Sequence, residues 1–144
     1  MTDSLSGQII TFYSYKGGTG PTMALANIAS LLARQDLAVK AAMPRRVLAI
    51  DWDFEAPGLH QYLQPYLESN SKKRFTEAPG CLELFQHLRN GRSDYNPKDF
   101  VDNRQRARST LEALDLEPYL LQTRIPGLTM MKAGTLNDEY ARHV

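Results

Sequence analysis

The residues best suited to chemistry lie in two short stretches of the chain. The first is the glycine-rich run Lys16-Gly17-Gly18-Thr19-Gly20-Pro21-Thr22, and the second carries the acids Asp51 and Asp53. Glycines let a backbone curl until successive N–H groups point into one concavity, which is how a loop holds phosphate. Thr22 stands where such loops place the hydroxyl that ligates Mg²⁺. The first stretch therefore predicts a phosphate-binding loop.

Predicted strands and a helix position both stretches. Residues 8–14 are apolar and aromatic on both faces, which is typical of a central parallel strand covered by helices. Residues 21–34 predict a helix with a buried stripe of Leu25, Ile28, Ala29 and Leu32. Residues 46–51 form a second apolar run that ends in Asp51, at the sheet edge where ligands bind in open α/β folds. The order strand, glycine loop, helix is the context that a phosphate loop requires.

The remaining segments complete an α/β pattern. We expect helices at 59–67, 80–91, within 96–116 and from 137 onward, and strands at 119–125 and 128–132. A polar exposed loop is predicted at 68–79, a connector at 35–44 and a disordered lead-in at 1–7. A helix that starts at the last residues indicates a fragment of a larger domain, incomplete at its C-terminus.

Composition excludes several classes of function. The 144 residues suffice for one domain, and a net charge of +1 favours neither nucleic acid nor a membrane surface. A single cysteine, Cys81, excludes an internal disulfide, and three scattered histidines argue against zinc. The N-terminus lacks a signal-peptide apolar run, and no segment has the roughly 20 apolar residues that span a bilayer. These observations predict a cytoplasmic protein.

One residue departs from the usual phosphate loop. The standard pattern ends in Gly-Lys-Ser/Thr, and here Pro21 occupies the lysine position between Gly20 and Thr22. Proline suits the first position of a helix, because that N–H has no partner within the helix. It nevertheless removes a cation and an N–H donor, and a charge-assisted contact to phosphate contributes roughly 1.5–3 kcal/mol. The loop sequence thus supports the predicted α/β fold more firmly than it supports phosphate binding.

With these motifs the chain resembles the ParA/MinD-type ATPases, P-loop enzymes with a deviant phosphate loop. The similarity lies in residues 14–27 and in the run from Asp51 to Leu59, and it is closest to a bacterial subgroup with a KGGxGRT-like loop. It covers residues 8–67 well and 119–144 weakly. The resemblance implies a three-layer, Rossmann-like P-loop domain with a mostly parallel sheet, of which residues 8–144 are the N-terminal part, ending before the family's third acidic motif.

The resemblance also implies roles for the matching positions. Lys16 would reach the phosphates of a nucleotide bound in a partner subunit, and Asp53 would orient the attacking water. Thr22 and Asp51 would hold the Mg²⁺ of bound ATP. The nucleotide-binding stretch would comprise Lys16, Gly17, Gly18, Thr19, Gly20, Pro21, Thr22 and Met23. The implied cofactors are ATP and Mg²⁺, and the implied partners are a second copy in a nucleotide sandwich and a protein or fused signalling or repeat domain.

Two functions remain open from the sequence. The first is a switch that binds and hydrolyses ATP and signals through its loops; the second is a degenerate domain that acts as an interaction or dimerisation scaffold. Each motif also has a plainer explanation: the glycines as a simple turn, Lys16 as a solvated side chain, and Asp51 and Asp53 as helix-capping or surface acids. The basic runs at 72–74 and 104–108 are interpreted as solvated faces, so they indicate neither nucleic acid nor membrane binding.

Overall fold

The structure is a computed structural model that describes residues 7–16, 18–34, 46–90 and 100–135, with the backbone alone at 100–103, 106 and 107. The connector at 35–44, the helix from 137 and all but Gly7 of the lead-in lie outside the described residues. The α-helices are α1 (Pro21–Arg34), α2 (Leu59–Leu63), α3 (Ser69–Arg74), α4 (Cys81–Asn90) and α5 (Phe100–Glu112). The 3₁₀ turns are η2 (Gln64–Tyr66) and η3 (Glu117–Tyr119), and the strands are β1 (Val47–Ile50), β2 (Leu121–Gln122) and β3 (Leu128–Met131).

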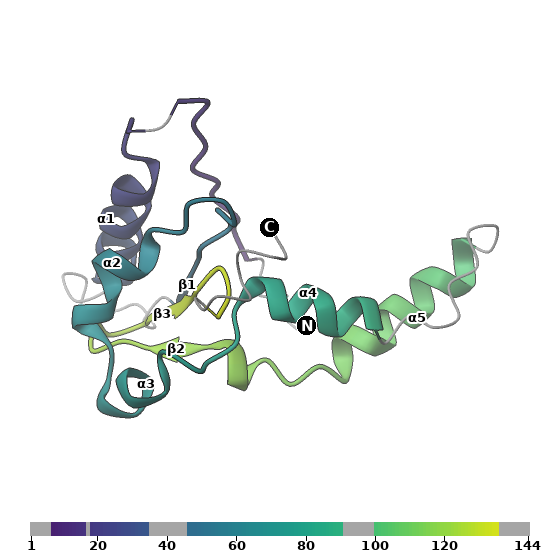
Figure 1. The fold of residues 1–144 in the computed structure, drawn as a ribbon. Helices are drawn as coiled ribbons and strands as arrows, with labels where there is room; N and C mark the ends of the chain where they lie inside the picture. Colours follow the sequence, from purple (N-terminus) through teal and green to yellow (C-terminus); the bar gives the residue numbers. More distant parts are fainter. Residues whose placement is uncertain (1–6, 17, 35–45, 91–99, 136–144) are drawn as a thin grey trace, which may run out of the picture.

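The three strands form one mixed sheet in the order β1-β3-β2 (Figure 1). β1 and β3 run parallel, with Val47 opposite Leu128 and Ile50 opposite Met131, whereas β2 pairs antiparallel with β3. The predicted strands at 46–51 and 128–132 are confirmed. The strand predicted at 119–125 shortens to two residues, because Pro118 lies in the 3₁₀ turn η3 just before it. The α/β class is confirmed, with a small mixed sheet.

The two faces of the sheet bury different clusters. On one face, Ala49, Leu128 and Met130 pack with residues of α1 and α2 in the main core. On the other face, Ile50 and Met131 belong to a smaller cluster with Cys81 and Leu84 of α4 and with Tyr119. Alternate residues of each strand point to opposite faces, which explains why neighbours such as Met130 and Met131 enter different clusters.

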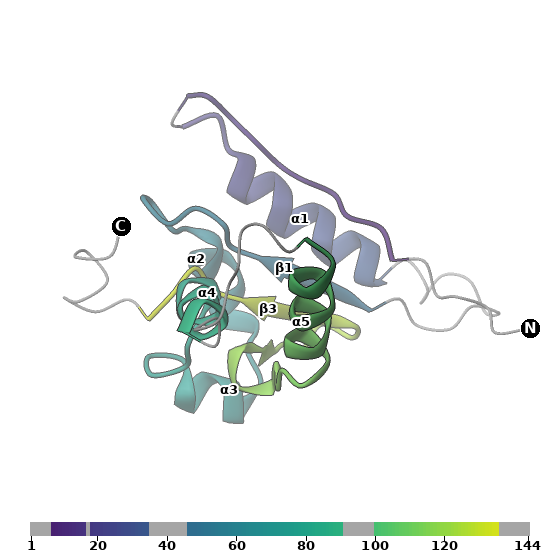
Figure 2. The same cartoon turned by 90° about the vertical axis from the view of Figure 1, so that its right-hand side faces the viewer.

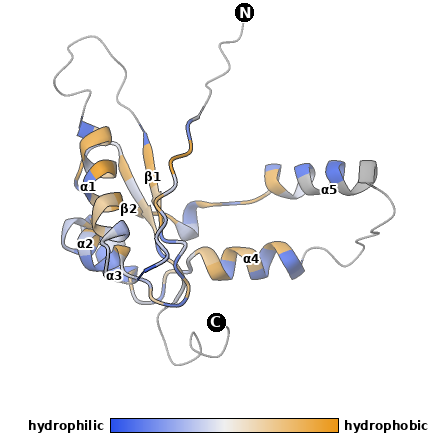
Figure 3. Ribbon diagram, turned by 90° about the horizontal axis from the view of Figure 1, so that it is seen from above, coloured by the Kyte–Doolittle hydropathy of each residue, from blue (hydrophilic) through white to orange (hydrophobic). Residues whose placement is uncertain are grey.

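The strand predicted at 8–14 is wrong for this structure. Residues 7–14 form no strand, and Ile9 and Tyr13 are 96% and 74% exposed. The stretch runs past α1 instead of joining β1, and its hydrophobic residues colour it orange (Figures 2 and 3). An apolar pattern signals burial, but a strand also needs a neighbour for its N–H and C=O groups. Within the described residues no strand pairs with the free edge of β1.

Two further predictions need correction. The region 68–79 contains the helix α3, which is stabilised by distant contacts: the Arg74 guanidinium donates to the carbonyl oxygens of Glu117, Pro118 and Leu120. Polar composition could not reveal those partners. In α1 the bounds are confirmed, but the buried stripe consists of small residues, Ala26, Ala29 and Ala33, while Ile28 is exposed. Alanines let the helix backbone lie close to the sheet.

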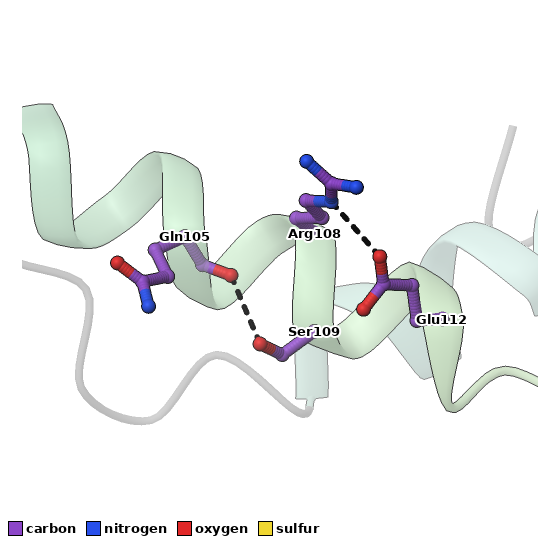
Figure 4. A network of polar contacts seen from close by, with 4 residues as sticks. All are labelled: Gln105, Arg108, Ser109 and Glu112. Atoms are coloured by element: carbon purple, nitrogen blue, oxygen red, sulfur yellow. Dashed lines mark hydrogen bonds and ion pairs between the residues drawn. The ribbon is translucent and has the colours of Figure 1, made fainter.

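The helices predicted at 59–67, 80–91 and 96–116 are confirmed as α2 with η2, α4 and α5. α4 and α5 extend away from the sheet on the side opposite α1 (Figure 1). The described polar contacts of α5 lie within that helix: Arg108 Nε pairs with Glu112 Oε1 at 2.8 Å, and Ser109 Oγ donates to the carbonyl of Gln105 (Figure 4). Of the helices described, none has the length and apolar character needed to cross a membrane.

Candidate functional site

The glycine loop adopts backbone conformations that require glycine. Gly18 and Gly20 have φ of +78° and +81°, in the left-handed region that side chains with a Cβ rarely enter. These two residues turn the chain from the extended stretch at 7–14 into α1. Gly17, the third predicted cradle residue, lies outside the described residues. The two described glycines therefore shape the loop as the sequence predicts.

The side-chain hydroxyls of Ser14 and Thr19 form hydrogen bonds with the backbone of Lys16. Ser14 Oγ and Thr19 Oγ1 lie 2.9 and 3.1 Å from the carbonyl oxygen of Lys16 and 2.5 Å from each other, so one hydroxyl donates to the other, which donates to the carbonyl. The Lys16 N–H donates back to Ser14 Oγ at 3.2 Å. Lys16 is thus fixed by its backbone, while the residue as a whole is exposed. An exposed lysine at this position is accessible to a neighbouring molecule.

The first turn of α1 presents free donors. Ala24 N–H donates to the carbonyl of Gly20 at 3.0 Å, so the hydrogen bonding of α1 starts from that glycine. Pro21 is the first helical residue and has no N–H to offer. The N–H groups of Thr22 and Met23 have no acceptor among the described residues. Together with the partial positive charge of the helix start, they favour an anion at this end.

Thr22 connects the loop to the acidic stretch. A Cβ built on Gly58 would lie 3.5 Å from Thr22 Cγ2 and 3.8 Å from Thr22 Oγ1. The hydroxyl of α1 therefore lies beside the end of the loop that leaves β1. The structure brings together the start of α1 and the segment after Asp51, which are about 30 residues apart in the sequence.

Asp51 is buried at the end of β1 and accepts three backbone hydrogen bonds. Its Oδ2 accepts from the N–H groups of Gly58 and Leu59, both at 3.0 Å, and its Oδ1 accepts from Asp53 N–H at 3.3 Å. Burial raises the pKa of this carboxyl, and the three N–H donors oppose that rise. Because Leu59 starts α2, Asp51 acts as a helix cap formed from outside the helix.

Asp53 has a different environment. It is exposed, and its Oδ1 accepts from Ala56 N–H at 2.9 Å. That bond stabilises the turn between β1 and α2 and leaves the other carboxylate oxygen directed to solvent or ligand. The described contacts of Lys16 and Asp53 do not join these two residues. Their cooperation would require a second subunit or a moved loop.

Three features of this region are not signalled by the sequence. The rings of Trp52, Phe54 and Phe85 form a cluster, here called the ring cluster, with centroids 5.1 to 6.4 Å apart. Gly58 lies beside Thr22. Lys132, one residue after β3, is fully buried and donates to the carbonyls of Phe75 and Thr76 at 2.6 and 3.3 Å. Only the position of Lys132 directly after an apolar strand could have indicated its burial.

The described residues hold no cluster of three or more His, Cys, Asp or Glu side chains that would bind a metal ion through protein ligands alone. Mg²⁺ in nucleotide sites uses only one or two protein oxygens besides phosphates and waters. Thr22 Oγ1 and the Asp51 carboxylate are oxygen donors of the type that Mg²⁺ takes, and Asp51 already accepts three backbone hydrogen bonds.

Comparison of the chain with protein-family models, with curated proteins and with solved structures found no match. Membership of a known family is therefore not shown. The resemblance to ParA/MinD-type ATPases rests on the motifs at 14–27 and 51–59 of the sequence.

Proposed function

We propose that this chain is part of a nucleotide-dependent switch of the ParA/MinD type, which binds ATP with Mg²⁺ at the glycine loop. The observation that carries the proposal is the meeting of Thr22 with Gly58, which brings the first turn of α1 to the carboxyl end of β1. Phosphate loops work in this arrangement, with a hydroxyl at the helix start and an acid at the end of a neighbouring strand.

Each predicted residue then has a task within the proposal. Gly18 and Gly20 turn the loop so that its N–H groups face the phosphates, and Thr22 ligates Mg²⁺. Asp51 holds the magnesium shell and the end of β1, and Asp53 orients water from its exposed position. Lys16 acts on a nucleotide bound to a second copy, which agrees with its exposure and with its lack of contact to Asp53. The complete three-layer P-loop domain belongs to this proposal as well.

A scaffold without hydrolysis is the second candidate, and two observations favour it. Pro21 removes the usual loop lysine and an N–H donor from the cradle. Asp51 already has three backbone donors on its carboxylate, which a purely structural cap would also have. In this alternative the loop keeps its shape for folding, and the domain serves as an interaction or dimerisation unit.

Calorimetric titration with ATP·Mg²⁺ and an assay of phosphate release separate the two candidates. For the switch we expect binding below millimolar ATP, at least tenfold weaker binding in Thr22→Ala, and near wild-type binding in Thr22→Ser, which keeps the hydroxyl. Lys16→Ala should abolish nucleotide-dependent dimerisation in sedimentation, while Lys72→Ala, an exposed lysine on α3, should leave it unchanged.

The variant Pro21→Lys decides between the switch and the scaffold when the wild type binds ATP weakly. Absence of wild-type binding at millimolar ATP, restored by Pro21→Lys, would refute the switch and support the scaffold. Hydrolysis by the wild type, lost in Asp53→Asn without loss of binding, would refute the scaffold.

A further inference from the structure

The loop from Asp51 to Gly58 is held in shape by the two acids that the proposed function assigns to the ligand. The Asp51 carboxylate accepts from the N–H of Asp53 near the start of the loop and from those of Gly58 and Leu59 at its end. The Asp53 carboxylate accepts from Ala56 N–H in the middle of the loop. A magnesium ion and its water shell would share these carboxylates with the N–H groups of the loop. Ion binding would then weaken or realign the hydrogen bonds that hold the loop in its present shape.

Two aromatic side chains of this loop pack on α4. Trp52 meets Phe85 edge-on at 5.1 Å between centroids, and Phe54 meets the same ring edge-on at 6.4 Å. Trp52 lies between the two acids in the sequence, and 61% of its surface is exposed. Phe85 is 39% exposed. The ring cluster thus joins the loop after β1 to α4 at a partly exposed contact.

The start of α4 is fixed to the end of β3. The N–H groups of Cys81 and Leu82 donate to the carbonyls of Lys132 and Ala133 at 2.9 and 2.8 Å. The Glu83 carboxylate accepts from Gly80 N–H at 2.7 Å and from Thr135 N–H at 2.8 Å. Phe85 therefore lies about one helical turn beyond a fixed point, where a push on its ring would turn or tilt the helix.

We propose that the ring cluster of Trp52, Phe54 and Phe85 couples ligand binding at the Asp51–Gly58 loop to the position of α4. This inference rests on the proposed function and names α4 as the element that carries its output. The packing of Phe54 and Leu84 on the smaller core cluster gives the contact a structural role too. The test must therefore measure something that packing alone would not change.

Trp52 is the only tryptophan of the chain, so its fluorescence reports on the loop directly. Affinities for ATP·Mg²⁺ and ADP·Mg²⁺ are measured by calorimetry, independently of that signal, in the wild type, Phe85→Leu and Phe85→Tyr. We expect ATP·Mg²⁺ to change the wild-type emission, and Phe85→Leu to lose at least half of that change. Phe85→Leu should also alter the ratio of the two affinities about 2- to 10-fold, the range that an aromatic pair supplies. Phe85→Tyr, which keeps the ring, should behave as the wild type.

The outcomes separate this inference from the proposed function. If ATP binds but Phe85→Leu keeps both the emission change and the affinity ratio of the wild type, the coupling is refuted and the switch stands. If calorimetry detects binding of neither nucleotide, both are refuted. His87→Ala, an exposed change on α4 two residues after Phe85, serves as the control and should leave both readouts unchanged.

Discussion

Replacing Lys132 by methionine should remove a pH-dependent loss of stability. Lys132 is 1% exposed, and its Nζ lies 5.0 Å from the centroid of the Phe75 ring. It donates to two carbonyl oxygens, but no carboxylate of the described residues forms an ion pair with it. Burial lowers its pKa from 10.5 to about 8, against a weaker opposing effect of Glu83. Methionine keeps the length and loses the charge.

The sign of the effect follows from proton binding. Between pH 8 and 10.5 the unfolded chain keeps a proton on Lys132 that the folded protein releases, so the free energy of unfolding rises with pH in this window. The difference of about 2.5 pKa units corresponds to about 3 kcal/mol, which the folded state loses below pH 8. At pH 7, Lys132→Met removes this cost of burying the charge. It also leaves the carbonyls of Phe75 and Thr76 without a donor, which lowers the free energy of unfolding by about 1–3 kcal/mol.

Urea unfolding at pH 7, 8, 9 and 10 measures the prediction. The free energy of unfolding of the wild type minus that of Lys132→Met should rise by about 2 kcal/mol between pH 7 and 10. The other titratable groups occur in both proteins, so their contributions cancel in the difference. Lys72→Met, at an exposed lysine of α3, should give a flat difference. If the stability difference between the wild type and Lys132→Met is also independent of pH, the prediction that Lys132 is a buried cation with a lowered pKa is refuted.

Three other predictions concern the same region. Asp51→Asn should lower the free energy of unfolding by about 1–3 kcal/mol in urea unfolding, because one amide oxygen cannot serve three N–H donors; an unchanged value would contradict the capping role. Cys81 should react with iodoacetamide at pH 8 far more slowly in the folded than in the unfolded protein, since burial raises the pKa of its thiol to about 11; equal rates would contradict that burial. Gly80→Ala should destabilise by about 2 kcal/mol or more, because its Cβ would meet the carbonyl of Lys132 at 2.4 Å. The matched change Gly58→Ala, at φ −137° and in ordinary contact with Thr22, should have an effect below about 1 kcal/mol.

Local sequence signals predicted the elements whose stability is local. α1 has the predicted bounds because proline suits its first position and alanines and leucines favour a helix. β1 follows from a short apolar run next to an acid. The stretch at 8–14 has a similar apolar pattern, but no strand among the described residues pairs with it. α3 depends on Arg74 reaching carbonyls more than 40 residues away, which composition cannot indicate.

The candidate site, like the fold, was predictable from the sequence only where its geometry is local. The positive φ of Gly18 and Gly20 agrees with their residue type in a turn that leads into a helix. The contact of Thr22 with Gly58 depends on how α1 lies over the sheet, so it required the fold. The ring cluster required it as well, since Phe85 comes from a helix about 30 residues after Trp52.

Asp51 shows why the capping and ligand-binding explanations of an acid after a strand need not exclude each other. Its three backbone bonds explain its burial without any ligand, so its presence alone cannot argue for nucleotide binding. The same bonds make the conformation of residues 51–58 depend on whatever else that carboxylate binds. In the proposed function, an ion held by Thr22 would act on Asp51 through Gly58, which lies beside Thr22 and donates to the Asp51 carboxylate. Loss of stability in Asp51→Asn tests the cap, and loss of the Trp52 response in the same variant tests the sensor.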